Sequence, residues 1–451
     1  MAARDPIGLR SGGWRDRLTA LIRRYRVPGA ALAFLHEGEI HEYAAGMLNL
    51  DTGVEATTDS LFQIGSVTKV WTATQLMLLR GQGRIALDTR VAEVLPEFKV
   101  ADADVSRTVT IRHLLSHTSG LDGDLLLDTG RGDDCIERYV AACAELPQVA
   151  PPGTTHTYCN AGFIILGRVL ERVTGKVWDD ALREQIIEPL GLTHTWTLPE
   201  DVLRFRAATG HLSVPGADPR TTPVWGMMRS FGPTSLISAS AADVVAFGRE
   251  HLDGGAFHFP VMREPEIAVP NPYTYGGHWG LGWILTSWGG HQVLMHPGNT
   301  LGQSAMLWVV PEVNAVVALL SNADHGPSTG LQQAVATELF AELYGLRVPP
   351  LLGPPREPPQ VDVDRFAGVY ERTGTQMALS VRDGALHLRM TDFTPYARLS
   401  EPVEMDLVPV DATTFVGRRP HEPTWSSFVF FALPDGSPCV HHSVRATPKI
   451  S

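Results

Sequence analysis

Lysine, cysteine and long apolar runs are all scarce in this chain of 451 residues. Among its 37 basic residues only Lys69, Lys99, Lys176 and Lys449 are lysines, and 49 acidic residues bring the formal net charge to −12. Nucleic acids and anionic membrane surfaces are bound through clustered positive charge, and no basic run of that kind occurs. We therefore expect neither nucleic acid nor a membrane as a partner.

The four cysteines are too few, and too irregularly spaced, for a disulfide framework or a C-x-x-C metal site. No apolar stretch reaches the ~18 residues that a membrane-spanning helix needs. The first residues also lack the apolar run of a signal peptide. These absences predict a cytoplasmic protein with reduced thiols. Since no phosphate-binding loop, dinucleotide fingerprint or metal-binding histidine spacing is present, we expect no cofactor and no metal.

The length predicts two or more domains, because a single hydrophobic core stops growing beyond ~250–300 residues. Apolar residues on both sides of Gly38 predict a hairpin, and strand-like runs return after residue 280. The predicted strands cover 30–34, 41–45, 281–286, 292–295, 304–310 and 315–320, and the predicted helices cover 66–80, 111–116, 136–144, 162–174, 178–187 and 331–343. This order predicts an α+β fold for residues 1–346, with one antiparallel sheet flanked by helices and a helical insertion at about 75–230.

The C-terminal part has a different pattern. Residues 347–362 contain three Pro-Pro pairs, which are typical of a stiff linker because proline fixes φ and removes a backbone donor. From residue 363 to 451 short runs of alternating polar and apolar residues are separated by Asp-Gly turns at 383–384 and 435–436. This pattern predicts a small all-β domain, either a sandwich or a barrel.

Ser66 and Lys69 stand three residues apart in a predicted helix, so their side chains share one face. The helix is apolar on most faces, and we expect it to be buried. Burial lowers the pKa of an amine and lets a lysine act as a base, whereas an arginine cannot be deprotonated in a protein. The alternative is an ordinary lysine whose amine reaches solvent along an amphipathic helix.

Two further groups are candidates for the same site. Tyr158 and Asn160 precede an apolar helix; a tyrosine beside a cationic lysine can have its pKa lowered and relay protons, and Asn160 could hold both the lysine and a substrate carbonyl. Asn160 could also merely cap that helix. His296 and Gly298 follow a predicted strand, where the glycine would let a substrate backbone approach and Pro297 would fit a strand edge. Taken alone, His296 could equally be a structural histidine.

Together the motifs S-x-x-K, Y-x-N and H-x-G follow the chain order of the class C β-lactamase-like serine hydrolases. The stretches VPGAALAF, TVTIRHLLSHTSGL and GLGW also resemble this family, over roughly residues 20–345. The family includes class C β-lactamases, DD-peptidases, D-aminopeptidases, esterases and some acyltransferases. The all-β tail resembles the lipocalin-like domain that some members carry.

The resemblance implies a role for each matching residue. Ser66 would be the nucleophile that forms an acyl-enzyme, and Lys69 and Tyr158 would share the work of the general base. The residues that bind or orient the substrate would be Asn160, His296, Gly298 and Asn299. Backbone N–H groups of Ser66 and Asn299 would form the oxyanion hole, in which the loss of one donor costs ~3–4 kcal/mol.

The sequence departs from the penicillin-recognising members at one place. Those members carry K-T-G where this chain has His296, Pro297 and Gly298. A histidine is mostly neutral at pH 7, and Pro297 lacks the threonine hydroxyl that would hold a substrate carboxylate. These two changes disfavour β-lactamase and DD-carboxypeptidase activity.

We therefore expect a hydrolase of small esters or amides, similar to an esterase, amidase or D-aminopeptidase. The alternative is an acyltransferase of secondary-metabolite biosynthesis, in which an amine or alcohol accepts the acyl group from the same intermediate. A binding protein that has lost activity is disfavoured because Ser66, Lys69, Tyr158 and Asn160 are all present. The sequence predicts neither the acyl group nor the oligomeric state.

Overall fold

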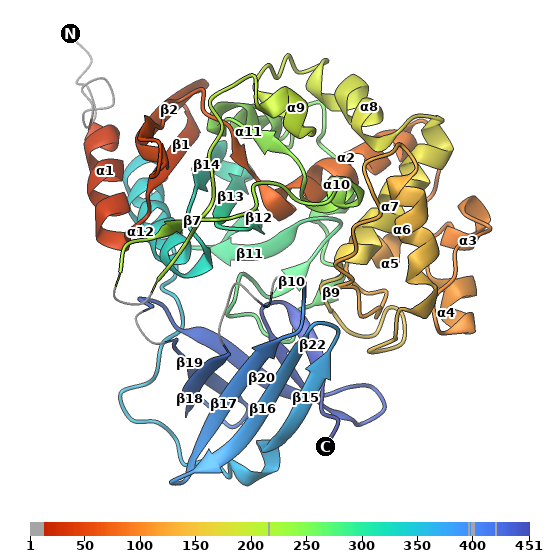
Figure 1. Ribbon diagram of the computed structural model, residues 1–451, viewed down its shortest axis with the longest axis vertical. Coiled ribbons are helices and arrows are strands. Elements are labelled where there is room, and N and C mark those ends of the chain that lie inside the picture. The colour runs from red at the N-terminus through yellow and green to blue at the C-terminus, as the bar shows by residue number, and fades with distance from the viewer. Residues whose placement is uncertain (1–12, 215–216, 396, 398–401, 420–421) are drawn as a thin grey trace.

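The computed structural model describes residues 13–214, 217–395, 397, 402–419 and 422–451. Figure 1 shows two parts: a larger one, with helices around a central sheet, which ends at helix α12 (His325–Tyr344), and a smaller all-β one below it. A proline-rich segment without helix or strand connects them between residues 345 and 363. The predicted α+β class with a separate all-β domain is confirmed.

The central sheet has nine antiparallel strands in the order β3-β2-β1-β14-β13-β12-β11-β10-β9. Strand β1 pairs with β14, from Ala30 opposite Ser321 to Leu35 opposite Val316, so the N-terminal hairpin joins the late strands in one sheet as predicted. The strands are β1 (Gly29–His36), β2 (Glu39–Asn49), β3 (Val54–Glu55), β9 (Ile267–Ala268), β10 (His278–Trp279), β11 (Ile284–Trp288), β12 (His291–Thr300), β13 (Gln303–Val310) and β14 (Ala315–Ser321). In the described part of the chain before α12, five short strands lie outside this sheet: β4 (Phe62–Gln63), β5 (Thr195–Trp196), β6 (His211–Leu212), β7 (Arg220–Thr221) and β8 (Ser238–Ala239). Strand β8 pairs with both β4 and β5.

The sheet is the middle layer of three. Alternate side chains of β1 enter opposite cores, because successive residues of a strand point to opposite faces. Leu32 and Phe34 pack in the core that also contains α12 and α1 (Gly13–Tyr25). Ala33 and Leu35 pack in the core that contains α2 (Thr68–Gly81) and the helical block. A strand buried on both faces explains the nearly continuous apolar run of β1.

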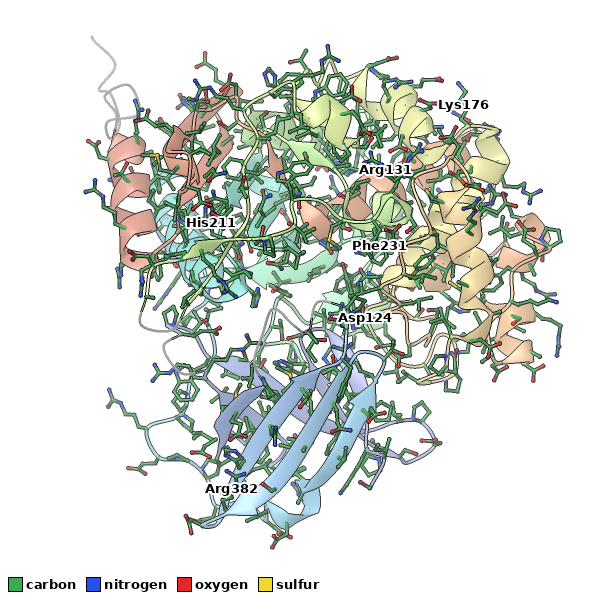
Figure 2. All side chains as sticks on the ribbon, viewed as in Figure 1. Asp124, Arg131, Lys176, His211, Phe231 and Arg382 are labelled. Atoms are coloured by element: carbon green, nitrogen blue, oxygen red, sulfur yellow. The ribbon has the colours of Figure 1, made fainter. Side chains whose placement is uncertain are left out.

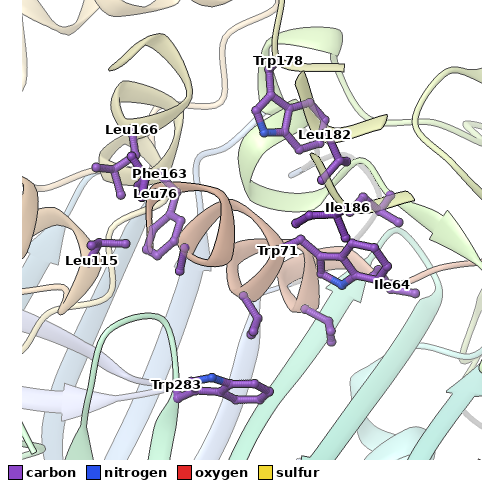
Figure 3. Packing of buried hydrophobic residues seen from close by; sticks show 14 of the residues in the cluster. Ile64, Trp71, Leu76, Leu115, Phe163, Leu166, Trp178, Leu182, Ile186 and Trp283 are labelled. Carbon is purple, nitrogen blue, oxygen red and sulfur yellow. The ribbon is translucent and has the colours of Figure 1, made fainter. Parts of the chain in front are cut away.

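The helical block packs on the second face of the sheet mainly through its last helix, and most of its other helices lie beside the sheet (Figure 1). Its helices are α3 (Val91–Val94), α4 (Ala103–Thr108), α5 (Ile111–Leu115), α6 (Cys135–Ala142), α7 (Asn160–Thr174), α8 (Trp178–Leu182) with a π-helical turn (Arg183–Ile187), α9 (Pro199–Val202), α10 (Gly232–Ser235) and α11 (Ala241–Arg249). Short 3-10 turns occur at Cys143–Glu145, Arg229–Phe231, Pro260–Arg263, Pro311–Val313 and Asp364–Phe366. Figure 3 shows Trp71 and Leu76 of α2 within one apolar cluster with Phe163 and Leu166 of α7. None of the helices in the described ranges combines the length and apolar character that a membrane crossing requires.

One predicted strand is displaced. The sequence predicted a strand at 281–286, but β11 begins at Ile284. The Gly280 N–H donates to the Trp283 oxygen at 2.9 Å, which closes a tight turn between β10 and β11. Leu281 is therefore buried in the turn, and its apolar side chain gave the appearance of an earlier strand start.

The C-terminal part is a nearly closed barrel in which consecutive strands pair antiparallel. The strands are β15 (Gly368–Arg372), β16 (Thr375–Arg382), β17 (Ala385–Asp392), β18 (Val403–Pro409), β19 (Thr414–Gly417), β20 (Ser426–Ala432), β21 (Pro438–His442) and β22 (Arg445–Pro448). The first and last strands approach at one bridge, Tyr370 opposite Lys449, and the Ile450 N–H donates to the Val369 oxygen at 2.7 Å. Asp383 and Gly384 both have positive φ, 50° and 78°, as the predicted two-residue hairpin turn requires.

Candidate active site

Ser66 and Lys69 lie where the turn η1 (Gly65–Val67) runs directly into α2. The Lys69 Nζ atom donates to Ser66 Oγ at 3.1 Å and to the backbone oxygen of Thr234 at 3.1 Å. Lys69 is fully buried, whereas Ser66 keeps partial exposure. The site thus pairs an accessible hydroxyl with an amine that is shielded from solvent.

The Ser66 turn is pressed against strand β12, and two glycines make this approach possible. Gly65 has a φ of +51°, and a Cβ on it would lie 2.6 Å from the Asn299 nitrogen. A Cβ on Gly298 would lie 1.8 Å from the Ile64 backbone oxygen. Gly298 therefore admits the Ser66 turn itself, where the sequence suggested the approach of a substrate backbone. The same packing brings the backbones of Ser66 and Asn299 together.

Lys69 has a strongly perturbed proton affinity. Burial lowers the pKa of its amine well below the usual range, and the Arg445 guanidinium lowers it further. Asp124 and Cys159 act in the opposite direction, but less strongly. The amine also lies 4.8 Å from the centre of the Tyr158 ring. A lysine with a lowered pKa has a larger neutral fraction at pH 7 and can accept a proton.

Tyr158 is 7% exposed and stacks on His117, with ring centres 4.1 Å apart. Burial raises the pKa of its hydroxyl, although the neighbouring Ser66 hydroxyl and Arg445 lower it. The predicted lowering of the Tyr158 pKa is therefore wrong, because burial outweighs the groups that lower it, and Tyr158 stays a neutral phenol. Among the described residues its hydroxyl meets no partner at full hydrogen-bonding geometry. A buried hydroxyl left in this way costs about 1–3 kcal/mol unless a bound molecule completes it.

His296 is also buried and neutral. Burial lowers its pKa to about 3, and Lys69 adds to the effect. Its Nδ1 atom lies 2.7 Å from the Pro297 oxygen, which makes Nδ1 the donor and leaves Nε2 as an acceptor without a described partner. Pairing with β11 ends at Met295, so from His296 onward β12 pairs only with β13 in the described chain. Pro297 thus lies on a locally open strand edge, as expected for a residue without a backbone donor.

Asn160 is held by groups from two directions. Its Nδ2 atom donates to Asp124 Oδ1 at 2.9 Å, and its Oδ1 atom accepts from the Thr234 hydroxyl at 3.1 Å. Asp124 in turn contacts two arginines of the barrel, Arg372 at 2.6 Å and Arg445 at 2.5 Å. These two cations lower the pKa of Asp124 to about 2 despite its burial. Figure 2 shows Asp124 where the two parts of the molecule meet.

The barrel also contacts the Tyr158 loop through its backbone. The Tyr158 N–H donates to the Val444 oxygen at 2.9 Å, and the Ala446 N–H donates to the Thr157 hydroxyl at 3.2 Å. Val444 occupies the turn between β21 and β22 with a φ of 62°. A β-branched residue rarely adopts this conformation, and such strain persists where the surroundings enforce it.

The structure places Ser66, Lys69 and Tyr158 side by side, with the H-P-G strand along one wall; their catalytic roles stay predictions. Asn160 is linked to Lys69 through Thr234. The Thr234 hydroxyl donates to Asn160, and the Thr234 backbone oxygen accepts from Lys69. Four residues of the cluster were not predicted from the sequence: Asp124, Thr234, Arg372 and Arg445. No local motif marks them, and the arginines are more than 240 positions from Asp124.

The chain matches the family model described as "Beta-lactamase" over residues 14–342. It is 48% identical over 373 residues to penicillin-binding protein 4 of Amycolatopsis lactamdurans, which covers 80% of this chain and 97% of that protein. The crystal structure of SurE with D-Leu matches 98% of this chain and 100% of its own, with a TM-score of 0.75 and 26% identity.

A D-stereospecific amidohydrolase from Streptomyces sp. matches with a TM-score of 0.59 and 25% identity, over 73% of this chain and 98% of its own. The family match therefore covers the part of the chain that contains Ser66, Tyr158 and His296. The family model matches most of the chain, and one relative is identical to it at nearly half of the aligned residues. This chain therefore belongs to the beta-lactamase family of serine hydrolases.

Proposed function

We propose that this protein is a serine acyl-transfer enzyme that forms an acyl-enzyme on Ser66 from a small ester or amide. The observation that carries the proposal is the contact between Ser66 Oγ and the amine of Lys69 at 3.1 Å, with Lys69 fully buried. A buried amine of lowered pKa beside an accessible hydroxyl is the arrangement that activates a serine nucleophile.

Acylation uses Lys69 as the base. Its neutral amine accepts the Ser66 hydroxyl proton while Oγ attacks the carbonyl carbon of the substrate. The carbonyl oxygen becomes an oxyanion and accepts hydrogen bonds from the backbone N–H groups of Ser66 and Asn299. When the tetrahedral intermediate collapses, the bond to the leaving group breaks, and that group takes a proton that the neutral Tyr158 hydroxyl relays from Lys69. The product is an ester on Ser66.

Deacylation reverses the proton flow. Water gives its proton to Lys69 as it attacks the ester carbonyl, and Ser66 recovers a proton when the acid leaves. In both steps Asn160 orients the substrate directly and orients Lys69 by way of Thr234. His296 offers its Nε2 atom as a hydrogen-bond acceptor. Because His296 is neutral and Pro297 has no hydroxyl, the wall lacks the features that hold a β-lactam carboxylate, which supports an ester or amide substrate.

We further propose that the acyl group ends in a D-amino-acid residue. Two of the related structures concern D-configured chemistry, namely SurE with D-Leu and the D-stereospecific amidohydrolase. An acyl donor of this class is an ester or amide and has no free carboxylate at the reacting carbonyl, in agreement with the wall at His296.

An amine or alcohol acceptor is the second candidate for deacylation. Its support is the barrel, which donates and accepts backbone hydrogen bonds at Thr157 and Tyr158 and so covers one side of the site. Transfer to an acceptor requires that water be kept from the acyl-enzyme. The same intermediate then gives a new ester or amide in place of the free acid.

A fluorophosphonate probe tests the nucleophile. We expect the wild type to be labelled on Ser66, with the site located by mass spectrometry of the digested protein. Ser66→Ala should lose the label, while Ser437→Ala, in the exposed turn between β20 and β21, should keep it. Failure to label the wild type would contradict the proposal.

Matched pairs of D- and L-configured aminoacyl p-nitroanilides, with and without an amine acceptor, test the substrate and the acceptor. We expect kcat/KM to favour the D-configured member by at least about tenfold, equal to about 1.4 kcal/mol. Free acid as the main product at saturating acceptor would support hydrolysis and reject transfer to that amine. An equal rate for both enantiomers would contradict the assignment of the acyl group.

A further inference from the structure

The barrel reaches the reacting groups through one carboxylate. We propose that Asp124 is a positioning residue through which the barrel arginines fix the Asn160 side-chain amide and, by way of Thr234, Lys69. This inference rests on the proposed roles of Ser66 and Lys69, and it assigns the barrel a working part in the site.

Asp124 is 13% exposed, and both of its oxygens are occupied. Oδ1 accepts from Asn160 Nδ2 at 2.9 Å and from Arg445 Nη2 at 3.0 Å. Oδ2 contacts Arg372 Nη1 at 2.6 Å and Arg445 Nε at 2.5 Å. Two guanidinium groups on one carboxylate hold it in place, since each presents several donors in a fixed plane.

This contact decides which way the Asn160 amide points. An ionised carboxylate only accepts hydrogen bonds, so Nδ2 must face Asp124. Oδ1 then faces Thr234 and accepts its hydroxyl at 3.1 Å. The reversed amide would set Oδ1 against the Asp124 carboxylate. The backbone oxygen of the same Thr234 accepts from Lys69 Nζ at 3.1 Å, so the order imposed at Asp124 extends to the base.

The charges of the cluster also act on Lys69. The titratable and charged groups that face it are Arg445 on β22, Asp124 in the loop after α5, His117 in the same loop, Tyr158 and Cys159 before α7, and His296 on β12. Burial raises the pKa values of Tyr158 and Cys159 and lowers those of the two histidines, so all four are neutral at pH 7. Arg445 and Asp124 therefore remain the charged pair, and they shift the pKa of Lys69 in opposite directions.

A purely structural Asp124 would tie the barrel to the loop without affecting the chemistry. The two roles differ in what substitution does to the pH profile. Loss of a structural contact lowers stability but leaves the proton affinity of Lys69 unchanged. Loss of a charge beside Lys69 moves the acidic limb of the profile, and its direction depends on the sign of the charge removed.

The test is the rate constant of fluorophosphonate labelling at Ser66 in the full-length protein, measured against pH. For Asp124→Asn we expect the acidic limb to move to lower pH, and for Arg445→Met to higher pH. Asp124→Glu keeps the charge but lengthens the side chain, so the limb should stay in place while the maximal rate falls about 10- to 100-fold. Asp133→Asn is the matched control, because Asp133 lies in the same loop and also pairs with an arginine, Arg229, but is mostly exposed.

Melting curves identify any variant that does not fold. If another variant fails to fold, the maximal labelling rate of Asp124→Glu alone tests the inference. The inference would be overturned if the acidic limbs of Asp124→Asn and Arg445→Met did not move, or if both moved in the same direction. The proposed function would still be supported in that case, provided that the wild type is labelled at Ser66. A full maximal rate in Asp124→Glu would also overturn the inference. An unlabelled wild type would reject both proposals.

Discussion

The two parts of the molecule contribute to the same site with groups of different kinds. The larger part, which ends at α12, supplies side chains whose charged forms are disfavoured by burial, namely Lys69, Tyr158 and His296. The barrel supplies Arg372 and Arg445, whose charge is permanent in a protein. Proton transfer needs groups that change their charge, and anchoring needs groups that do not. Because lysine is scarce in this chain, a lysine at position 69 and arginines in the barrel are a clear chemical difference between the two parts.

Exchanging the two kinds of cation is expected to have the largest effect. Lys69→Arg places a permanent charge where a base is needed, and we expect labelling of Ser66 to slow about 10³-fold. Arg445→Lys keeps the barrel charge but loses the two-point contact with Asp124, so the slowing should be about tenfold. Labelling rates measure both.

Lys176→Arg is the control for the first exchange, because Lys176 lies on the outer surface of the helical block (Figure 2) and pairs with Glu184. It should leave the rate unchanged. Equal rates for Lys69→Arg and Arg445→Lys would remove the distinction between the two parts.

The same substitution at one glycine in each part should separate them by stability. In Gly298→Ala the new Cβ would lie 1.8 Å from the Ile64 backbone oxygen, which cannot give way without moving the Ser66 turn. In Gly417→Ala the nearest atom, at 2.5 Å, belongs to the flexible Met405 side chain. We expect unfolding free energies lower by about 3 kcal/mol and about 1 kcal/mol respectively. Denaturant melts measure both, and a greater loss at Gly417 would contradict this account.

Acid should destabilise the molecule in two windows. Burial lowers the pKa of His251 to about 3, so below pH ~6.5 the unfolded chain binds a proton that the folded one refuses, and stability falls by about 1.4 kcal/mol per pH unit. Asp124 has its pKa lowered to about 2, so its contribution is complete above pH ~4 and is lost only as the pH falls towards 2. Melting temperatures from pH 8 to 3 measure the first window.

His251→Gln should make that first slope shallower by about 1.4 kcal/mol per pH unit, since glutamine does not titrate. A slope should remain, because burial also lowers the pKa values of His156 and His296 to about 3. Asp124→Glu should leave the slope unchanged. An unchanged slope in His251→Gln would assign the acid sensitivity to other groups.

The smallest expected effect is at the turn between β21 and β22. Asparagine tolerates positive φ better than a β-branched residue, so Val444→Asn should raise the unfolding free energy by about 0.5–1 kcal/mol. The backbone oxygen that accepts from Tyr158 is retained, so labelling of Ser66 should not change. A fall in the labelling rate would mean that the Val444 side chain itself shapes the site.

Much of the fold was predictable because local patterns carried it. Strands β13 and β14 are apolar runs buried on both faces, and the alternation in the barrel matched a surface with one buried side. The start of β11 was not predictable, because a buried turn residue such as Leu281 has the same apolar character as a strand residue. Whether Leu281 lies in a turn or in a strand depends on the hydrogen bond between Gly280 and Trp283, which the sequence pattern does not indicate.

The site was predictable only where its chemistry lies in short motifs. The proximity of Ser66, Lys69 and Tyr158 was predictable because the S-x-x-K and Y-x-N motifs occur in the chain order of a known family, and the roles of these residues stay predictions. The raised pKa of Tyr158 could not be predicted, since it depends on how fully tertiary packing buries the ring. Asp124 and its arginines were also beyond prediction, because an ion pair between two domains leaves no spacing in the chain.

The arginine contacts at Asp124 restrict how this protein can be recombined. A chimera that combined this catalytic part with a foreign barrel would bury Asp124 without its two cations, and an isolated buried charge costs several kcal/mol. The barrel is therefore not an independent module, although its described strands pair only with one another. Exchange between relatives should succeed only when Asp124, Arg372 and Arg445 are transferred as one unit.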